Sequence, residues 1–225
     1  MPRTLCRHCQ RPETVCICRF TFPVANDIHL VVLQHPSEVS QSKGTVPLLS
    51  KSLRSCDVLV GENFTHEPNF LDITKKYQTL LLYPSEHAIE IDQALISQLT
   101  ASTLIKSQGS KPLCLVILDG TWKKAYRMFM LSKNLQQLPQ VCLPQYLANA
   151  GQYHIRKVAK KNALSSLEAS CYALALIEAG SDFARVTPEQ AGKYQPLLNK
   201  FQEFNQFQLS FRPEYSNISR KPDDS

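Results

Sequence analysis

The sequence has no hydrophobic run long enough to cross a bilayer, which argues against a membrane-spanning protein. Its first residues lack the apolar segment of a secretory signal, so we expect a cytoplasmic protein. No internal repeat is present, which argues against solenoid and propeller folds. The 225 residues are 43% hydrophobic and 20% charged. Such a chain can bury a sizeable core as one domain, with room for a small appendage.

Acidic residues are fewer than basic ones, 19 against 25, which gives a net charge of +6. An excess of this size suits a polyanionic partner without requiring one. On charge alone we favour a nucleic-acid partner over a role confined to neutral small molecules.

The eight cysteines fall into two sets of four. One set is crowded near the start of the chain (Cys6, Cys9, Cys16 and Cys18), and the other is dispersed among apolar residues (Cys56, Cys114, Cys142 and Cys171). Without an export signal, disulfides are not expected for either set. The crowded spacing predicts one tetrahedral structural zinc, with His8 a weaker candidate because four cysteines suffice. Redox chemistry is the alternative, but a Cys-x-x-Cys motif of that kind normally opens a helix in a βαβ unit.

Apolar runs predict strands at residues 28–34, 57–61, 79–83 and 113–118, and a short apolar segment at 140–143. Helices are predicted after Thr45 and at 89–104, 122–131, 164–179 and 187–207, whereas 62–76 is predicted to be irregular. Strands that alternate with helices predict an α/β fold, with a mostly parallel sheet flanked by helices. We expect three parts: a cysteine-rich element (1–22), a main domain (23–210) and a disordered tail (211–225).

The most informative stretch is the predicted strand 113–118 with the helix that follows it. Apolar residues at Trp122, Ala125, Tyr126, Phe129 and Met130 have the spacing of an amphipathic helix. Between strand and helix lies the turn Asp119-Gly120-Thr121, at the strand end where open α/β sheets bind ligands. A single glycine argues against a dinucleotide or phosphate loop. The turn has two interpretations, a helix cap with an anchoring tryptophan or a site with an aspartate base or clamp.

Five ordered blocks of this sequence resemble proteins of the DTW-domain family. They are Asp119-Gly120-Thr121-Trp122, the four crowded cysteines, Gln34-His35-Pro36 with Glu38, Tyr83-Pro84-Ser85, and Leu164-Ser165-Ser166-Leu167-Glu168-Ala169. Together they extend from residue 6 to about residue 180. Ser166 departs mildly from the family pattern, where threonine is expected.

The resemblance implies a tRNA-uridine aminocarboxypropyltransferase. Such an enzyme moves the 3-amino-3-carboxypropyl group of S-adenosylmethionine to N3 of a tRNA uridine and releases methylthioadenosine. The layout suggests a variable-loop uridine. The resemblance also implies a relative of the SPOUT methyltransferase fold, with a trefoil knot. Two alternatives stay open, a SPOUT-type RNA methyltransferase and a non-catalytic zinc-containing RNA-binding module, as does the oligomeric state.

The resemblance also suggests roles for individual residues. Asp119 is the candidate catalytic residue; because aspartate is a weak base near neutral pH, we expect it either to be partly buried or mainly to orient the substrate. Candidates for binding the cofactor are Tyr83, Ser85, Leu118, Thr121, Trp122, Ser165, Ser166 and Glu168. Ser165-x-x-Glu168 also has the pattern of a helix capping box, and the two roles are compatible.

Basic residues supply the candidates for gripping tRNA phosphates. They are Lys123 and Arg127 on the helix after the turn, and Arg156, Lys157, Lys160 and Lys161 before the capping box. A run of charges is as often only a solvated face, and both interpretations stay open.

Overall fold

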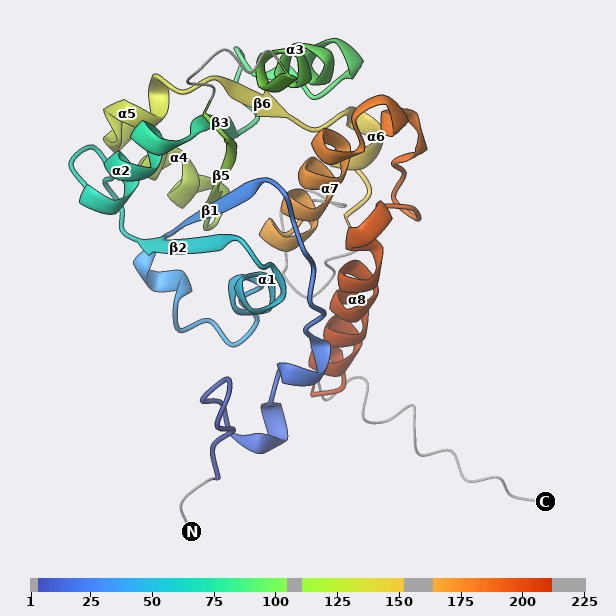
Figure 1. The fold of residues 1–225 in the computed structure, drawn as a ribbon. Coiled ribbons are helices and arrows are strands. Elements are labelled where there is room, and N and C mark those ends of the chain that lie inside the picture. Colours follow the sequence, from blue (N-terminus) through green and yellow to red (C-terminus); the bar gives the residue numbers. More distant parts are fainter. Residues whose placement is uncertain (1–3, 105–110, 152–163, 212–225) are drawn as a thin grey trace.

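A single six-stranded sheet forms the centre of the computed structural model, which describes residues 4–104, 111–151 and 164–211 (Figure 1). Neighbouring strands are all parallel, in the order β2-β1-β5-β3-β6-β4. The strands are β1 (His29–Gln34), β2 (Cys56–Val60), β3 (Gln78–Leu82), β4 (Ile89–Glu90), β5 (Leu113–Asp119) and β6 (Gln140–Cys142). The predicted α/β fold with a parallel sheet is therefore confirmed.

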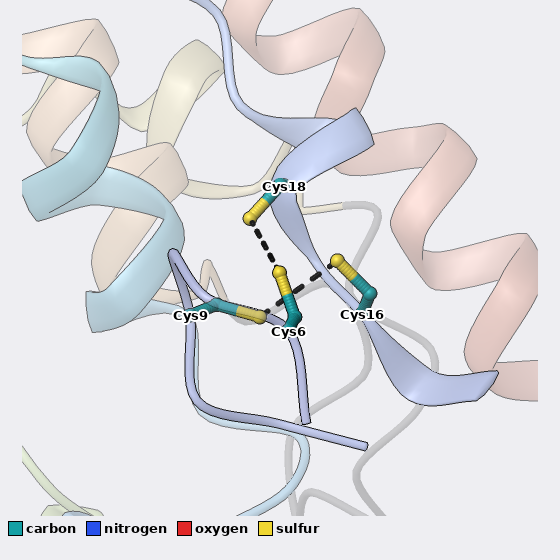
Figure 2. Close-up of side chains that lie close together, drawn as sticks. All are labelled: Cys6, Cys9, Cys16 and Cys18. Atoms are coloured by element: carbon teal, nitrogen blue, oxygen red, sulfur yellow. Dashed lines mark hydrogen bonds between the residues drawn. The ribbon is translucent and has the colours of Figure 1, made fainter. Parts of the chain in front are cut away.

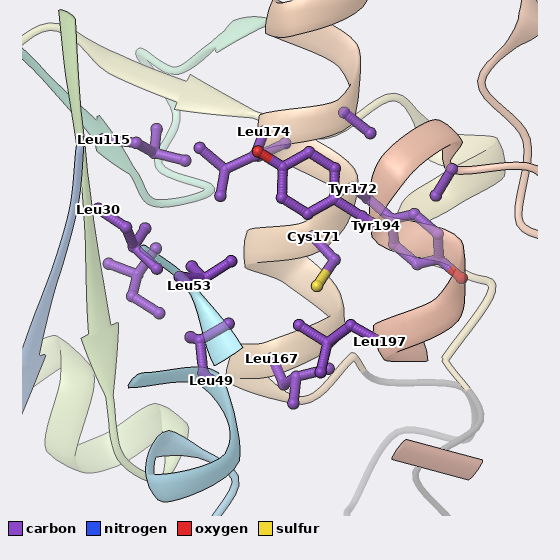
Figure 3. Close-up of a cluster of buried hydrophobic side chains, with 14 of the residues drawn as sticks. Leu30, Leu49, Leu53, Leu115, Leu167, Cys171, Tyr172, Leu174, Tyr194 and Leu197 are labelled. Carbon is purple, nitrogen blue, oxygen red and sulfur yellow. The ribbon is translucent and has the colours of Figure 1, made fainter. Parts of the chain in front are cut away.

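Both faces of the sheet are covered, as the continuous apolar runs predicted. Alternate side chains of β1 enter different cores, Leu30 and Val32 on one face and Val31 and Leu33 on the other. The larger core lies against α1 (Val46–Ser52), α7 (Ser166–Ala179) and α8 (Gln195–Leu209) (Figure 3). The smaller core lies under α2 (Pro68–Lys76), α4 (Trp122–Leu131) and α5 (Lys133–Gln136). Two further α-helices are α3 (Gln93–Leu104) and α6 (Gln145–Ala148).

The cysteine-rich element at the start of the chain packs against the main domain. Ile17 and Phe20 are 1% and 4% exposed and belong to the larger core. The ring of Phe20 contacts Phe204 and Phe207 of α8, with centroids 5.6 and 5.2 Å apart. The cysteine-rich element therefore contributes side chains to the larger core.

Three expectations about local structure were wrong. Within the segment 62–76, residues 68–76 form α2, because Glu67 accepts a hydrogen bond from the N–H of Phe70 and the helix buries Phe70 and Ile73. The helix expected from residue 89 begins only at Gln93, and Ile89–Glu90 extends the sheet as β4. The last helix begins at Gln195 instead of 187, after the short 3-10 turns Gly180–Arg185 and Gly192–Tyr194.

Across the described ranges, none of the helices combines the length and hydropathy that a membrane span requires.

Candidate active site

The candidate site lies where β1 and β5 end side by side. Gln34 and Asp119 are register partners, and the N–H of His35 donates to the carbonyl of Asp119 over 3.0 Å. After β1 the chain runs through α1 to β2 on one side, whereas after β5 it runs through α4 and α5 to β6 on the other. The two helical connections cover opposite faces of the sheet (Figure 1). This is a topological switch point, the usual ligand-binding location in open α/β sheets.

The carboxylate of Asp119 is buried and firmly oriented. Asp119 is 8% exposed. The amide Nε2 of Gln34 donates to Oδ2 over 2.9 Å, and the hydroxyl of Ser166 donates to Oδ1 over 2.6 Å. Both donors are neutral. The two hydrogen bonds fix the orientation of the carboxylate and leave one accepting direction on each oxygen for a ligand.

A second layer of charged groups holds the turn after β1 against α4. The buried Glu38 pairs with Nζ of Lys124 over 2.8 Å. His35 Nδ1 accepts from the N–H of Ser37, so Nε2 carries the proton and donates to Glu62 over 2.9 Å. The segments that carry Asp119 and Gln34 are thereby locked together.

Two further contacts complete this layer. Arg127 donates to the second oxygen of Glu62 over 3.2 Å. A Cβ at Gly120 would lie 3.1 Å from the Cβ of Lys124 and 3.6 Å from that of His35, so a side chain there would crowd Lys124.

The helix after the turn is oriented differently from the prediction. Thr121 caps α4 by accepting from the N–H of Lys124, as the capping interpretation predicted. The helix buries Ala125 and Met128, however, and leaves Trp122, Tyr126 and Met130 about half exposed. The interpretation of Trp122 as an anchor to the sheet was therefore wrong, since helical spacing identifies a stripe but not the part of it that meets the sheet.

The residues predicted to bind the cofactor do not all approach Asp119. Ser166 contacts it directly. Ser165 and Glu168 form the predicted capping box of α7: Oγ of Ser165 accepts from the N–H of Glu168 over 3.2 Å, and the carboxylate accepts from the N–H of Ser165 over 2.7 Å. Glu168, 2% exposed, is thus engaged in the cap.

The remaining candidates follow the ends of β3 and β5. Tyr83 stacks on Phe129 of α4 with centroids 4.7 Å apart, and burial raises the pKa of its phenol. Ser85 uses its hydroxyl to accept from the N–H of His87 over 3.2 Å. Leu118, in β5, is half-buried against the smaller core. Thr121 and Trp122 are exposed beside Asp119.

The predicted RNA-binding residues divide in two. Lys123 and Arg127 are exposed on α4. The second group, Arg156, Lys157, Lys160 and Lys161, lies outside the described residues.

Four residues of the site were not assigned roles from the sequence: Gln34, His35, Glu38 and Glu62. The first three belong to a block shared with the DTW-domain family, so the resemblance marked their position but not their contacts. Glu62 had no signal, because it lies in the segment predicted to be irregular.

Two hollows in the described parts of the chain lie elsewhere. One of about 630 Å³ is lined by Glu90, Asp92, Tyr146 and Phe183 among others, and one of about 240 Å³ lies around Lys193. Neither includes Asp119. The switch-point geometry and the held carboxylate, rather than cavity size, identify the candidate site.

The four crowded cysteines form a separate cluster that could hold a metal ion (Figure 2). All four sulfurs lie within 4.8 Å of one another, and the Cys6–Cys18 and Cys9–Cys16 pairs are 3.8 Å apart. Backbone N–H groups of Cys9 and His8 lower the pKa of Cys6 to about 6, whereas desolvation and the neighbouring sulfurs raise that of Cys18 to about 12. Four thiolates this close would repel one another unless a cation lies between them.

Sequence comparison identifies a protein family and several relatives of this chain. A family model described as "DTW domain" matches residues 3–209. A protein of Macaca fascicularis named "tRNA-uridine aminocarboxypropyltransferase 2" is 33% identical over 183 residues, which is 78% of this chain and 57% of that protein. The Drosophila melanogaster protein of the same name is 32% identical over 183 residues, 78% of this chain and 67% of its own. The chain thus spans between about half and two thirds of the length of these relatives. No solved structure matches the chain.

Proposed function

Because this chain belongs to the DTW domain family, we propose that it is a tRNA-modifying transferase. In the proposed reaction the 3-amino-3-carboxypropyl group of S-adenosylmethionine passes to N3 of a tRNA uridine, in the variable loop. The N3–C bond forms, the C–S bond of the sulfonium breaks, the N3 proton is lost and methylthioadenosine leaves. The names of the relatives support the reaction class. The observation that carries the proposal is the buried, doubly held carboxylate of Asp119 at the switch point.

Asp119 is proposed to accept a hydrogen bond from N3–H of the uridine. Gln34 and Ser166 occupy one accepting direction on each oxygen, so the direction of a third hydrogen bond is restricted. An aspartate removes an imide proton poorly at neutral pH. We therefore propose that Asp119 mainly orients the uracil ring and that its carboxylate receives the N3 proton as the N3–C bond forms and the C–S bond breaks.

The groups around Asp119 are proposed to hold the cofactor. Tyr83 and Ser85 follow β3, Leu118 and Thr121 flank Asp119, and Trp122 stands exposed beside it. The N-terminus of α7, which begins at Ser166, offers a positive helix end to the carboxylate of S-adenosylmethionine, whereas the N–H of Ser165 is engaged by Glu168. Glu168 is proposed to act through the cap, not by contact with the cofactor.

The cysteine cluster is proposed to hold a structural zinc. Four sulfurs about 2.3 Å from one tetrahedral zinc lie about 3.8 Å from one another, and the two close sulfur pairs have this separation. With four protein ligands no position is open for a substrate. The ion would then order residues 4–22 and hold Phe20 in the core.

We also propose three finer features. These are a SPOUT-like fold with a trefoil knot, which the resemblance implies, a division at residues 22 and 210, and a cytoplasmic location. The parallel sheet and its switch point support the first of these. A crystal structure that follows the backbone continuously from residue 119 to 179 tests the knot.

The direct test incubates the purified protein with unmodified tRNA and S-adenosylmethionine and analyses the nucleosides by mass spectrometry. We expect a uridine carrying the aminocarboxypropyl group, together with methylthioadenosine. A methylated nucleoside would instead identify a methyltransferase. Failure to bind S-adenosylmethionine would leave only an RNA-binding role.

A further inference from the structure

The outer face of α4 exposes large apolar side chains that the described parts of the chain leave uncovered. Trp122, Tyr126 and Met130 are 57%, 57% and 50% exposed. Because they are four residues apart, they lie along one side of the helix at intervals of about one turn. The row begins three residues after Asp119 and leads away from it. Contiguous exposed apolar side chains of this kind mark a binding surface.

The charges around this face select the partner. Helix α4 contains Lys123, Lys124 and Arg127 and no acidic residue, and Lys133 opens the next helix. Lys124 is engaged by Glu38 and Arg127 by Glu62, whereas Lys123, next to Trp122, and Lys133 are exposed. Aromatic rings interleaved with cations are the composition that binds single-stranded nucleic acid, since rings stack on unpaired bases and cations meet phosphates.

The extent of the face argues against a second copy of the chain as the occupant. A fully buried aromatic side chain covers 150–250 Å², so three half-exposed side chains present roughly 300 Å². A stable protein interface needs about 800 Å² on each partner. The face has the size of a few stacked bases, not of a dimer interface.

We propose that Trp122, Tyr126 and Met130 form a stacking platform for unpaired nucleotides of the substrate RNA. The indole stands where the target base and the cofactor must meet, and Tyr126 and Met130 receive nucleotides beside the target. The inference rests on the proposed function only in taking RNA as the substrate. It adds that the RNA is recognised as an unpaired strand along α4.

The protein has one tryptophan, so its fluorescence reports on this face alone. We expect single-stranded oligouridylate of about ten nucleotides to quench the emission of Trp122, and duplex RNA of the same length to quench it weakly. In Tyr126→Ala, binding measured by the same quenching should weaken about tenfold, the effect of losing one stacked base. The matched control is Tyr146→Ala, which removes a tyrosine of similar exposure, 48%, away from α4.

Several outcomes would overturn the platform. They are equal affinity of Tyr126→Ala and the unaltered protein, equal binding of duplex and single strand, or quenching by S-adenosylmethionine but not by RNA. Emission that shifts with protein concentration and is restored in Tyr126→Ala would show that a second copy covers the face. Transfer activity with no RNA quenching removes the platform and keeps the proposed function, whereas quenching without transfer does the reverse.

Discussion

Among single residues, the carboxylate of Asp119 is the group to which we assign the central role in the proposed reaction. Its two neutral donors come from separate elements, Gln34 at the end of β1 and Ser166 at the start of α7. A change in either element would therefore alter the direction in which the carboxylate meets a ligand. This geometry suits a carboxylate whose orientation matters to the reaction as well as its charge.

Replacing Asp119 by asparagine should abolish transfer without unfolding the protein. The amide oxygen of asparagine can accept from Gln34 and its NH₂ can donate to the hydroxyl of Ser166, so the local packing survives. We expect at least about a hundredfold loss of activity and a melting temperature changed by less than about 3 °C. Nucleoside mass spectrometry and calorimetry measure the two quantities.

The matched control for this variant is Asp72→Asn. Asp72 is exposed on α2, where it pairs with Lys75 of its own helix, and the exchange should leave transfer unchanged. Near-full activity in Asp119→Asn would remove the carboxylate from the mechanism.

Adjacent serines at the start of α7 should separate catalysis from stability. Ser166→Ala removes the 2.6 Å hydrogen bond to Asp119, and we expect kcat to fall about tenfold while the KM for tRNA stays constant. Ser165→Ala removes the helix cap and should cost about 1 kcal/mol of unfolding free energy but keep most of the activity. Ser166→Thr retains the hydroxyl and should restore kcat. Equal loss of kcat in both alanine variants would mean that Ser166 acts only through the helix.

How far these residues were predictable depends on the range of their contacts. The capping box is local in sequence, and Ser165 and Glu168 were placed correctly. Asp119 was located by its position after a strand, but its partners lie 85 and 47 residues away. No local pattern determines which side chain from a distant segment reaches a given oxygen.

Among the structural elements, we expect the cysteine-rich element to depend on a bound ion for its stability. Removing zinc with a chelator should release Phe20 from the core. Losing the burial of one phenylalanine costs about 2 kcal/mol, which should lower the melting temperature by about 5 °C in a chain of this size. Calorimetry with and without chelator measures the shift, and metal analysis should find one zinc per chain.

Cysteine variants and thiol labelling provide the controls for the zinc experiment. Cys16→Ser should lose the ion, whereas Cys142→Ser, outside the cluster, should keep it. Burial raises the pKa of Cys56 and Cys114 to about 12, so these thiols stay neutral and unreactive at physiological pH. A melting temperature unaffected by the chelator in a zinc-containing protein would mean that the ion has no structural role.

The elements themselves were predictable where one signal dominated. Strands buried on both faces appear as uninterrupted apolar runs, and β1, β2, β3 and β5 were placed within about two residues. Helix α2 was missed because its helical conformation depends on burying Phe70 and Ile73 against the sheet, a tertiary effect. The sequence also could not predict which part of the apolar stripe of α4 packs on the sheet. Trp122 and Ala125 both belong to this stripe, but only Ala125 is buried.

Across the whole molecule, the excess of positive charge predicts salt-sensitive binding to tRNA. The net charge of +6 is modest, so its distribution matters more than its sum. Part of it lies on α4, where Lys123 and Arg127 are exposed beside the candidate site. The densest basic stretch in the sequence, which contains Lys160 and Lys161, is close in the chain to Ser166, a partner of Asp119. We expect both groups to contact phosphates of one bound RNA.

Charge reversal at Lys160 and Lys161 tests this distribution. The double variant Lys160→Glu and Lys161→Glu should weaken tRNA binding. The negative slope of log K against log salt should become shallower by about 2, one unit for each lost phosphate contact. The matched control reverses Lys75 and Lys76, two exposed lysines of α2, and should change the slope much less. Filter binding at several salt concentrations gives both slopes. Because the two variants carry the same net charge, equal slopes would attribute binding to total charge and return the 160–161 pair to an ordinary solvated face.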